Sequence, residues 1–216
     1  MPSKSSHPIL AREGWPFIAT SLIAAIVVHI YLGGIWASPL WLLAIFCLQF
    51  FRDPKRTTSA DSNDIVCAAD GKVIFIGPVR DPYLDRQAVK ISVFMNVFNV
   101  HSNKAPVSGK IMQRWYKPGK FFNAALDKAA EQNEQNALWI KTPDGHDITC
   151  VQIAGLVARR ILCYVDEGDE LTVGQRYGFI RFGSRVDLYL PEGTDFKAVL
   201  GDKVTAGIDV LAVLPD

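Results

Sequence analysis

Three residues far apart in the sequence have side chains suited to nucleophilic chemistry: Ser184, His101 and Asp70. A serine hydroxyl becomes an effective nucleophile when a neighbouring base removes its proton, and histidine is the base best matched to neutral pH. Each residue also has an ordinary structural explanation. Asp70 lies in an Asp-Gly turn, His101 lies between an apolar strand and a proline-containing loop, and Ser184 falls on the apolar face of a predicted strand. None of the three indicates a function alone.

Ser184 has an unusual neighbour within the segment "GFIRFGSRVDLYLP", residues 178–191. Apolar residues fall on one face of this segment and polar residues on the other, which predicts one continuous strand. Gly183 directly precedes Ser184, at a point where a residue without a side chain weakens a strand. The Gly183-Ser184 pair therefore needs an explanation beyond strand formation.

The composition of the chain narrows the classes of function. The 216 residues, 49% of them hydrophobic, are enough for one domain with a core and an appendage. A formal net charge of +1 and the lack of a basic run interleaved with aromatics predict no nucleic-acid partner. The four cysteines are scattered, without a CxxC pair or a histidine at ligand spacing, so we expect neither a metal site nor a disulfide framework. Motifs of serine hydrolases, zinc proteases and nucleotide-binding loops do not occur either.

The hydrophobic residues are concentrated near the N-terminus. Residues 14–51 contain no Asp, Glu, Lys or Arg, and this run is long enough for two short spanning helices, at 15–32 and 35–51. Basic residues flank the run on both sides: Lys4 and Arg12 before it, and Arg52, Lys55 and Arg56 after it. Since basic flanks stay in the cytoplasm, the pattern favours a transmembrane hairpin over a single span. A cleaved signal peptide and a shallow re-entrant hairpin are the alternatives.

The flanks of the hairpin complete the predicted domain organisation. We expect a cytoplasmic N-terminus at 1–13, a polar linker at 52–64 and a mainly β domain at 65–216. Segments rich in β-branched and aromatic residues predict strands at 72–79, 87–95, 109–116, 137–142 and 147–155. One helix is predicted at 121–135, where Ala, Leu, Glu and Gln dominate.

Two segments of the β domain share a Gly-Asp turn pattern, at 165–180 and 199–214. Such turns at strand ends resemble those of biotinyl/lipoyl-type β-sandwich domains, so we expect a β-sandwich with repeats of this type. The likeness concerns the fold and carries no function.

Six short motifs, taken in their order along the chain, closely resemble the phosphatidylserine decarboxylase family in its short bacterial and archaeal form. They are "FFRDPKR", "CAADGKV", "VHSNKAPVSG", "KPGKF", "QIAGLVARRI" and "FGSRVDLYLP". The resemblance covers the chain from Phe50 to its C-terminus, and the apolar N-terminal segment fits it as well.

The resemblance implies that the chain cuts itself between Gly183 and Ser184, into a β chain, 1–183, and an α chain, 184–216. In the family the serine hydroxyl attacks the preceding carbonyl, and β-elimination and hydrolysis leave a pyruvoyl group derived from the serine. By resemblance, His101 is the base and Asp70 its orienter. The pyruvoyl carbonyl is then expected to form a Schiff base with phosphatidylserine, which loses CO₂ and becomes phosphatidylethanolamine.

One departure from the family concerns the second reaction. The longer bacterial form carries two histidines three residues apart, whereas this chain has Phe98 at the first position and only His101 at the second. The group that protonates the carbanion after loss of CO₂ is therefore left open.

The same resemblance implies phosphatidylserine and bilayer lipid as partners, at the cytoplasmic side of the cell (inner) membrane. Formation of a homo-oligomer is left open. Lys104, Arg159 and Arg160 are the nearest basic candidates for the lipid phosphate, and a role as solvated surface charges explains them equally well. Two alternatives stand beside this reading. One is a pyruvoyl-dependent decarboxylase of another amine-bearing lipid or amino acid, and the other is a non-enzymatic, membrane-tethered β-sandwich binding module.

Overall fold

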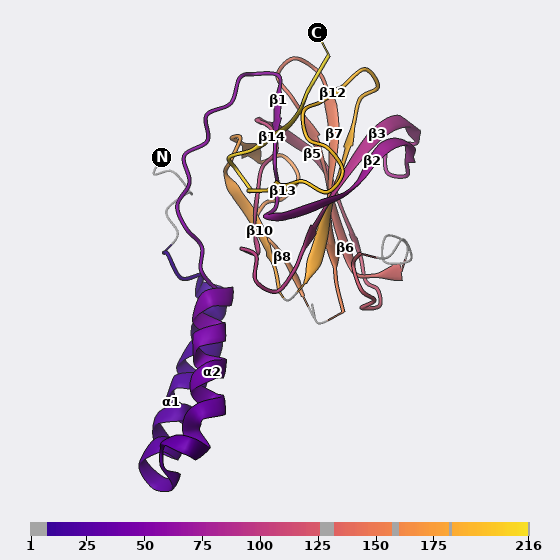
Figure 1. The fold of residues 1–216 in the computed structure, drawn as a ribbon. Coiled ribbons are helices and arrows are strands. Elements are labelled where there is room, and N and C mark those ends of the chain that lie inside the picture. Colours follow the sequence, from indigo (N-terminus) through magenta and orange to yellow (C-terminus); the bar gives the residue numbers. More distant parts are fainter. Residues whose placement is uncertain (1–7, 126–131, 157–159, 182, 216) are drawn as a thin grey trace. The chain divides into compact units, whose positions relative to one another are not determined.

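The computed structural model of the chain describes residues 8–125, 132–156, 160–181 and 183–215 (Figure 1). They belong to two compact units, Met1–Lys55 and Arg56–Asp216.

The first unit is a pair of apolar helices. After a short 3-10 turn at Arg12–Gly14, α1 spans Trp15–Leu32 and α2 spans Gly34–Phe50. Gly33 separates them with a φ of 89°, a conformation that glycine adopts at little cost, and the chain reverses there. Both helices lie within one residue of the bounds that the sequence predicted.

Small side chains line the contact between α1 and α2. Ala25, Ala37 and Ala44 are fully or almost fully buried, as small residues are where two apolar helices approach closely. Large apolar side chains point outward instead, with Tyr31 80% exposed and Ile35 86% exposed. By length and composition, the helical stretch Arg12–Leu32 is able to cross a membrane, and Gly34–Phe50 is an apolar helix of shorter length. An apolar outer surface of this kind is stable in lipid rather than in water.

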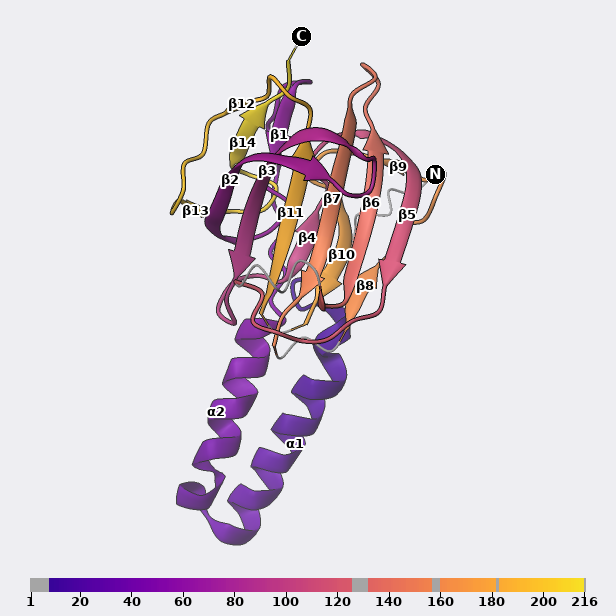
Figure 2. The ribbon, with the colours of Figure 1, turned by 90° about the vertical axis from the view of Figure 1, so that its right-hand side faces the viewer.

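The second unit consists of antiparallel strands in three sheets (Figures 1 and 2). An eight-stranded sheet has the order β13-β2-β3-β11-β7-β6-β5-β9. Its strands are β2 (Gly71–Asp81), β3 (Arg86–Met95), β5 (Gly109–Lys117), β6 (Gln135–Lys141), β7 (Asp147–Ala154), β9 (Glu170–Leu171), β11 (Ser184–Leu190) and β13 (Lys203–Val204). Two three-stranded sheets have the orders β1-β14-β12 and β4-β10-β8. Their strands are β1 (Asp64–Val66), β4 (Ser102–Lys104), β8 (Ile161–Cys163), β10 (Arg176–Ile180), β12 (Asp195–Phe196) and β14 (Val210–Val213).

The main core lies on one face of the eight-stranded sheet and takes side chains from all three sheets. Ile91 of β3 and Val186 of β11 pack there with Ile65 of β1 and Tyr177 of β10, and all four are buried. A smaller cluster around Val151 and Tyr189 covers the opposite face of the same sheet. The prediction of a mainly β domain is confirmed, and the five predicted strands correspond to β2, β3, β5, β6 and β7.

The helix predicted at 121–135 is wrong at both ends. Residues 121–125, at its start, are not helical. Gln135 begins β6, where it pairs with Lys117 on one side and Ile153 on the other, and Asn133 forms a bridge with Lys120. Pairing with two neighbouring strands overrides the helix preference of this stretch. Residues 126–131, the middle of the predicted helix, lie outside the described residues.

The prediction of one continuous strand over 178–191 is also wrong. β10 ends at Ile180 and β11 begins at Ser184, and the two strands belong to different sheets. Gly183, just before β11, has a φ of 66°, which a residue with a side chain rarely adopts. Gly183 therefore allows the chain to pass from one sheet to the other. The break cannot be recognised in the sequence, because apolar and polar residues alternate on both sides of Gly183.

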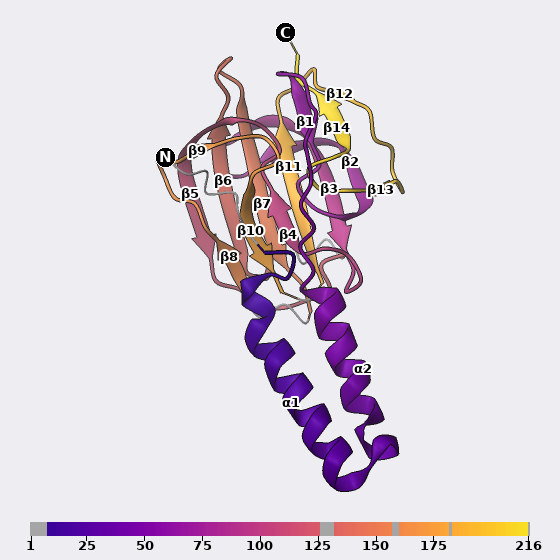
Figure 3. The same ribbon diagram turned by 90° about the vertical axis from the view of Figure 1, so that its left-hand side faces the viewer.

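The two Gly-Asp turns occupy equivalent positions in the fold. Gly168 and Gly201 both have positive φ, and their N–H groups donate to the carbonyls of Ile111 and Val73 at 2.8 and 2.9 Å. β9 then pairs with β5 and β13 with β2, at the two opposite edges of the eight-stranded sheet (Figure 3). The strands β4 to β10 thus form one half of the domain, inserted between β3 and β11 of the other half. Ser184 is the first residue after this insertion.

Candidate active site

Ser184 is enclosed at the start of β11. It pairs with Met95 at the end of β3 and with Ala154 at the end of β7, and it is fully buried. Its hydroxyl donates a hydrogen bond to the sulfur of Met95 at 3.1 Å. Because neighbouring strands hold it on both sides, Ser184 has a fixed position and no contact with solvent.

The carbonyl before Ser184 lies directly against a second glycine. A Cβ atom built on Gly155 would stand 2.1 Å from the carbonyl oxygen of Gly183, far inside van der Waals contact. Gly155 follows β7, and its lack of a side chain leaves the space that this oxygen occupies. The path of the backbone at the Gly183-Ser184 bond therefore depends on a glycine in another strand connection.

His101 stands on the other side of the same bond. The imidazole is fully buried, and its Nε2 accepts a hydrogen bond from the N–H of Gly183 at 3.1 Å. Its Nδ1 lies 3.0 Å from the carbonyl oxygen of Asn99, so Nδ1 carries the proton and Nε2 keeps its lone pair. The structure thus brings His101 to the residue next to Ser184, in the tautomer that a base requires.

Asp70 has different partners from those that the family resemblance implies. Its carboxylate accepts two hydrogen bonds from the guanidinium of Arg56, the second at 2.8 Å, and one from the N–H of Ala206 at 2.8 Å. The expected bond to His101 is not formed, since the Asn99 carbonyl is the acceptor at Nδ1. Asp70 therefore fastens the start of the second unit to the turn at Ala206.

The three predicted lipid-binding residues differ in their surroundings. Lys104 is 4% exposed, so its interpretation as a solvated surface charge is wrong. Arg160 is exposed, and its carbonyl is within 3.5 Å of the N–H of Arg181, two residues before Gly183. Arg159 lies outside the described residues.

Sequence reasoning missed a buried asparagine that closes the site. Asn133 donates to the carbonyls of Phe122 and Ala154 at 2.8 and 2.7 Å, and its own side-chain oxygen accepts from the N–H of Phe122. These bonds hold the chain at Phe122 against the end of β7, beside Gly155. The polar stretch "EQNEQN" gives no sign of this role.

A second missed feature is an ion pair next to Ser184. Arg185 and Asp187 form two hydrogen bonds of 2.7 Å on the face of β11 opposite Ser184, and both side chains are almost inaccessible to solvent. One guanidinium nitrogen also contacts the carbonyl of Ala124 at 3.5 Å. The spacing of two residues within a strand was the available signal, because such residues share a face.

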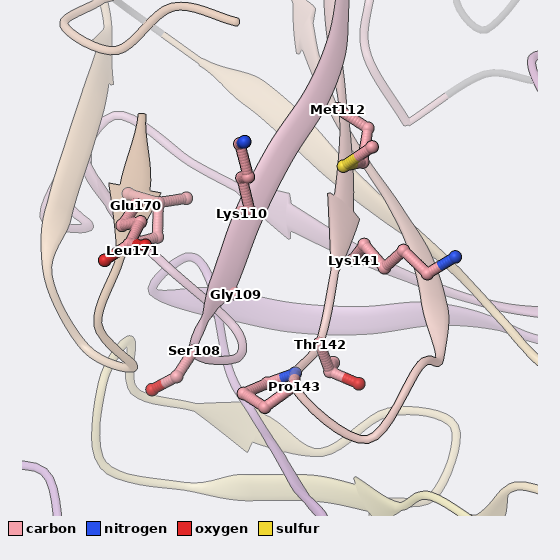
Figure 4. Close-up of a pocket in the computed structure, with 9 residues that line it drawn as sticks. All are labelled: Ser108, Gly109, Lys110, Met112, Lys141, Thr142, Pro143, Glu170 and Leu171. Carbon is pink, nitrogen blue, oxygen red and sulfur yellow. The ribbon is translucent and has the colours of Figure 1, made fainter. Parts of the chain in front are cut away.

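A pocket of about 490 Å³ lies apart from these residues, around the first part of β5 (Figure 4). Lys110 and Lys141 line it, but their amino groups point in different directions. Ser184, His101 and Asp70 do not contribute to its lining. Without convergent polar groups, this pocket does not form a specific site for a charged ligand.

The fold and the site together define a mainly β protein with a buried Gly-Ser bond beside a neutral histidine. The sequence profile of the phosphatidylserine decarboxylase family matches residues 43–212. A phosphatidylserine decarboxylase proenzyme of Aromatoleum aromaticum is 60% identical over 215 residues and covers 100% of both chains. Proteins of the same name from Nitrosomonas europaea and Burkholderia mallei are 58% and 56% identical and cover 95% and 97% of both chains. The chain belongs to the phosphatidylserine decarboxylase family.

Proposed function

We propose that this protein converts phosphatidylserine to phosphatidylethanolamine and CO₂, after cutting its own chain between Gly183 and Ser184. One observation carries the proposal. Ser184 is buried, and the residue before it, Gly183, donates its N–H to Nε2 of His101, in a chain that belongs to this family. The relatives carry the name proenzyme, which supports processing into two chains.

The first reaction uses residues of the chain alone. The hydroxyl oxygen of Ser184 attacks the carbonyl carbon of Gly183, the peptide C–N bond breaks, and an ester forms while the nitrogen gains a proton. β-Elimination of this ester then separates the two chains, leaving a carboxylate on Gly183 and a dehydroalanine at residue 184. Addition of water to the dehydroalanine, in its imine form, releases ammonia and leaves the pyruvoyl group. His101 is the base that takes the hydroxyl proton, held in the correct tautomer by the Asn99 carbonyl. In the uncut chain, Nε2 accepts from Gly183 and the Ser184 hydroxyl donates to Met95, so both must exchange partners before attack.

The second reaction requires a pyruvoyl group at residue 184, and the surroundings of this residue suit one. β11 is paired on both sides from Ser184 onward, so the new terminus of 184–216 keeps its place after cleavage. Burial beside Met95 also excludes bulk water. The carbonyl of a pyruvoyl group supplies an electron sink that stabilises the charge left by loss of CO₂.

The helices α1 and α2 suit a lipid substrate, since a diacyl lipid leaves the bilayer only at a cost of about 0.8 kcal/mol per exposed CH₂. We place both ends of the helical pair in the cytoplasm because basic residues flank it on each side. The β domain then acts at the cytoplasmic side of the inner membrane. A reporter fused after Asp216 should be accessible from the cytoplasm, and access from outside would exclude this topology.

Intact mass spectrometry of the purified protein tests the first reaction. Two chains are expected, with the small chain lighter than a peptide that begins with serine, because pyruvoyl replaces the serine residue. Ser184→Ala should leave one uncut chain. Ser92→Ala is the matched control, since Ser92 is also fully buried in the neighbouring strand β3, and it should be cut normally. A single uncut chain in active protein would exclude the proposal.

Release of labelled CO₂ from carboxyl-labelled phosphatidylserine tests the second reaction. Cut protein should release it and leave phosphatidylethanolamine, and hydroxylamine should abolish the release. Cut protein that ignores phosphatidylserine but decarboxylates another amine-bearing lipid or an amino acid would establish the alternative enzyme. Uncut protein that binds lipid without turnover would establish a binding module.

A further inference from the structure

Several connections of the β domain meet at the end of the eight-stranded sheet where Ser184 lies (Figure 2). Ser184 pairs with the last residues of β3 and β7, so residues 96–101 and 155–156 begin at its level. Lys117 at the end of β5 pairs with Gln135, which pairs with Ile153, so residues 118–125 start there too. We call residues 96–101, 118–125, 155–156 and 160 the site-end loops.

The site-end loops expose large apolar side chains. Leu156 is 67% exposed and Phe98 is 65% exposed, while Phe121 and Phe122 are 36% and 37% exposed. Two of these loops are held by hydrogen bonds. Asn133 joins Phe122 to the end of β7 with three hydrogen bonds, and the Asn96 side chain accepts a hydrogen bond from the N–H of Phe98 at 2.8 Å. Apolar side chains on a fixed rim around a buried site indicate a partner with an apolar surface.

The charge of the site-end loops restricts that partner further. Lys120 and Arg160 are exposed, and Lys120 lies 5.9 Å from the centre of the Phe122 ring. Within the described residues 96–101, 118–125, 155–156 and 160 there is no Asp or Glu, while Asp127, Lys128 and Glu131 of the connection from β5 to β6 lie outside the described residues. Apolar groups beside exposed cations match a bilayer with anionic headgroups, where the apolar groups enter the acyl region and the cations meet phosphates.

The opposite end of the same sheet carries a different set of charges. The turns 82–85, 142–146 and 191–194 precede β3, precede β7 and follow β11, so they lie at the far ends of these strands. They contain Asp85, Asp144 and Glu192 and no Lys or Arg. Asp85 forms an ion pair with Arg80 at 2.6 Å, and Arg86 and Lys141 flank the turns, so this end carries charges of both signs. An anionic surface is therefore attracted more strongly to the end that carries Lys120 and Arg160.

We propose that the site-end loops form a membrane-contacting surface that seats the β domain on an anionic bilayer, with the lipid headgroup entering toward Ser184 between them. The proposal deepens the proposed function, on which it rests for the identity of the lipid. It assigns the bilayer contact of the catalytic domain to Leu156, Phe98 and the two phenylalanines of 118–125, separately from α1 and α2.

Fluorescent labelling of full-length protein tests the contact without reference to activity. An environment-sensitive probe on Leu156→Cys is compared with probes on Asp144→Cys, at the far end, and on Leu200→Cys, whose native leucine is equally exposed at 67% but lies outside these loops. The half-buried Cys163 is replaced by alanine throughout. In vesicles of phosphatidylcholine with phosphatidylglycerol, only the probe at 156 should shift to the blue and be quenched by spin-labelled acyl chains. A probe at 156 whose fluorescence shows that it stays in water overturns the proposal. A blue shift that appears in detergent and grows with protein concentration also overturns it, because it indicates contact with a second copy of the protein.

Kinetics of Leu156→Ser against Leu200→Ser provide the second arm. Self-cleavage of both variants should be normal. For Leu156→Ser, the KM for phosphatidylserine in vesicles should rise by about tenfold, because part of the leucine side chain is no longer buried in the bilayer. The kcat on soluble short-chain phosphatidylserine should stay unchanged. An equal loss on both substrates overturns the proposal, because it places Leu156 inside the site. Wild-type protein that decarboxylates no lipid defeats the proposed function, and the labelling arm still decides the bilayer contact.

Discussion

The carbonyl oxygen of Gly183 lies so close to Gly155 that a Cβ atom on residue 155 would stand 2.1 Å from it. Residue 183 supplies the carbonyl that Ser184 is proposed to attack, and residue 155 forms the wall behind it. The close approach links the proposed self-cleavage to residue 155, which lies 28 residues earlier in the chain and follows β7, the direct neighbour of β11 in the sheet. Residue 155 must lack a side chain, because the carbonyl of Gly183 has to be held in a fixed orientation toward the Ser184 hydroxyl.

Replacing Gly155 by alanine should slow self-cleavage by roughly a hundredfold, because a displacement of about 1 Å is enough for a loss of that size. Cleavage is followed on gels from the time of synthesis. Gly77→Ala is the control, since its Cβ would meet only two ring carbons of Phe75, at 3.5 and 3.7 Å, which are ordinary contacts. Normal cleavage of Gly155→Ala would show that the backbone relaxes without cost and that residue 155 does not position the carbonyl.

His101→Ala should accumulate the uncut chain, with cleavage slower by about 10²–10⁴-fold, the usual contribution of a general base. The structural basis is the lone pair on Nε2, which faces Gly183 while Nδ1 is held by the Asn99 carbonyl. His146→Ala, in the turn before β7, should be cut at the normal rate. Normal processing of His101→Ala would remove this residue from the role of base.

Asp70→Asn should also slow self-cleavage, and Arg56→Gln tests the route. The Asp70 carboxylate is bonded to Arg56 and to the N–H of Ala206, so we expect both variants to be cut slowly and the double variant to be no worse than either. Pulse-labelled protein gives the rates. If Asp70→Asn is slow and Arg56→Gln is normal, Asp70 acts on His101 directly, as the family resemblance implies.

The strands and apolar helices were predictable because their signals are local. β-Branched and aromatic runs marked β2, β3, β5, β6 and β7, and a run without charge marked α1 and α2. The break between β10 and β11 was not predictable, because the alternation of apolar and polar residues continues on both sides of it. Only Gly183 marks the point where the chain passes from one sheet to the other. A pattern of period two carries no information about which sheet a strand joins.

The candidate site was predictable in its side chains and not in its backbone partners. Ser184 and His101 have types that suggest chemistry, and the structure brings them together. Asn99 contributes the backbone carbonyl that binds His101, and Gly155 leaves the space for the carbonyl oxygen of Gly183. Neither contribution comes from a side chain, so the sequence gives no signal for it. The partner of Asp70 was missed because Arg56 lies in a stretch that reads as a linker.

Removal of Asp187 should destabilise the β domain strongly. Arg185 is 3% exposed, and within the described part of the chain Asp187 is the carboxylate that balances its charge, through two hydrogen bonds. Asp187→Ala leaves a buried guanidinium without its carboxylate, which typically costs about 3–5 kcal/mol. Denaturant unfolding followed by circular dichroism measures the loss. Asp195→Ala is the control, because its ion pair with Lys197 is exposed and should contribute less than about 1 kcal/mol. Equal effects of the two substitutions would contradict the expectation.

Two buried thiols should make the β domain sensitive to alkaline pH. Burial raises the pKa of both Cys67 and Cys150 from 9.0 to about 12, and the charge of Asp70 adds to the effect at Cys67. Above about pH 9 the unfolded chain releases thiol protons that the folded chain retains, so the free energy of unfolding decreases as pH rises. Below about pH 9 both states hold the protons, and these thiols contribute no pH dependence.

Burial also raises the pKa values of Tyr83, Tyr177 and Tyr189, and these tyrosines add to the slope as the pH approaches 10. The thiol contribution is therefore measured between about pH 9 and pH 10 as the difference between the wild-type protein and a variant without the two thiols. Denaturant midpoints across this range should fall for the wild-type protein. A variant with both Cys67→Ala and Cys150→Ala is less stable at every pH because of the space left in the core, but its midpoint should fall less steeply. Some slope should persist from Cys163 and from the buried tyrosines, whose pKa values burial also raises. An unchanged slope in the double variant would contradict the assignment of the alkaline transition to these two thiols.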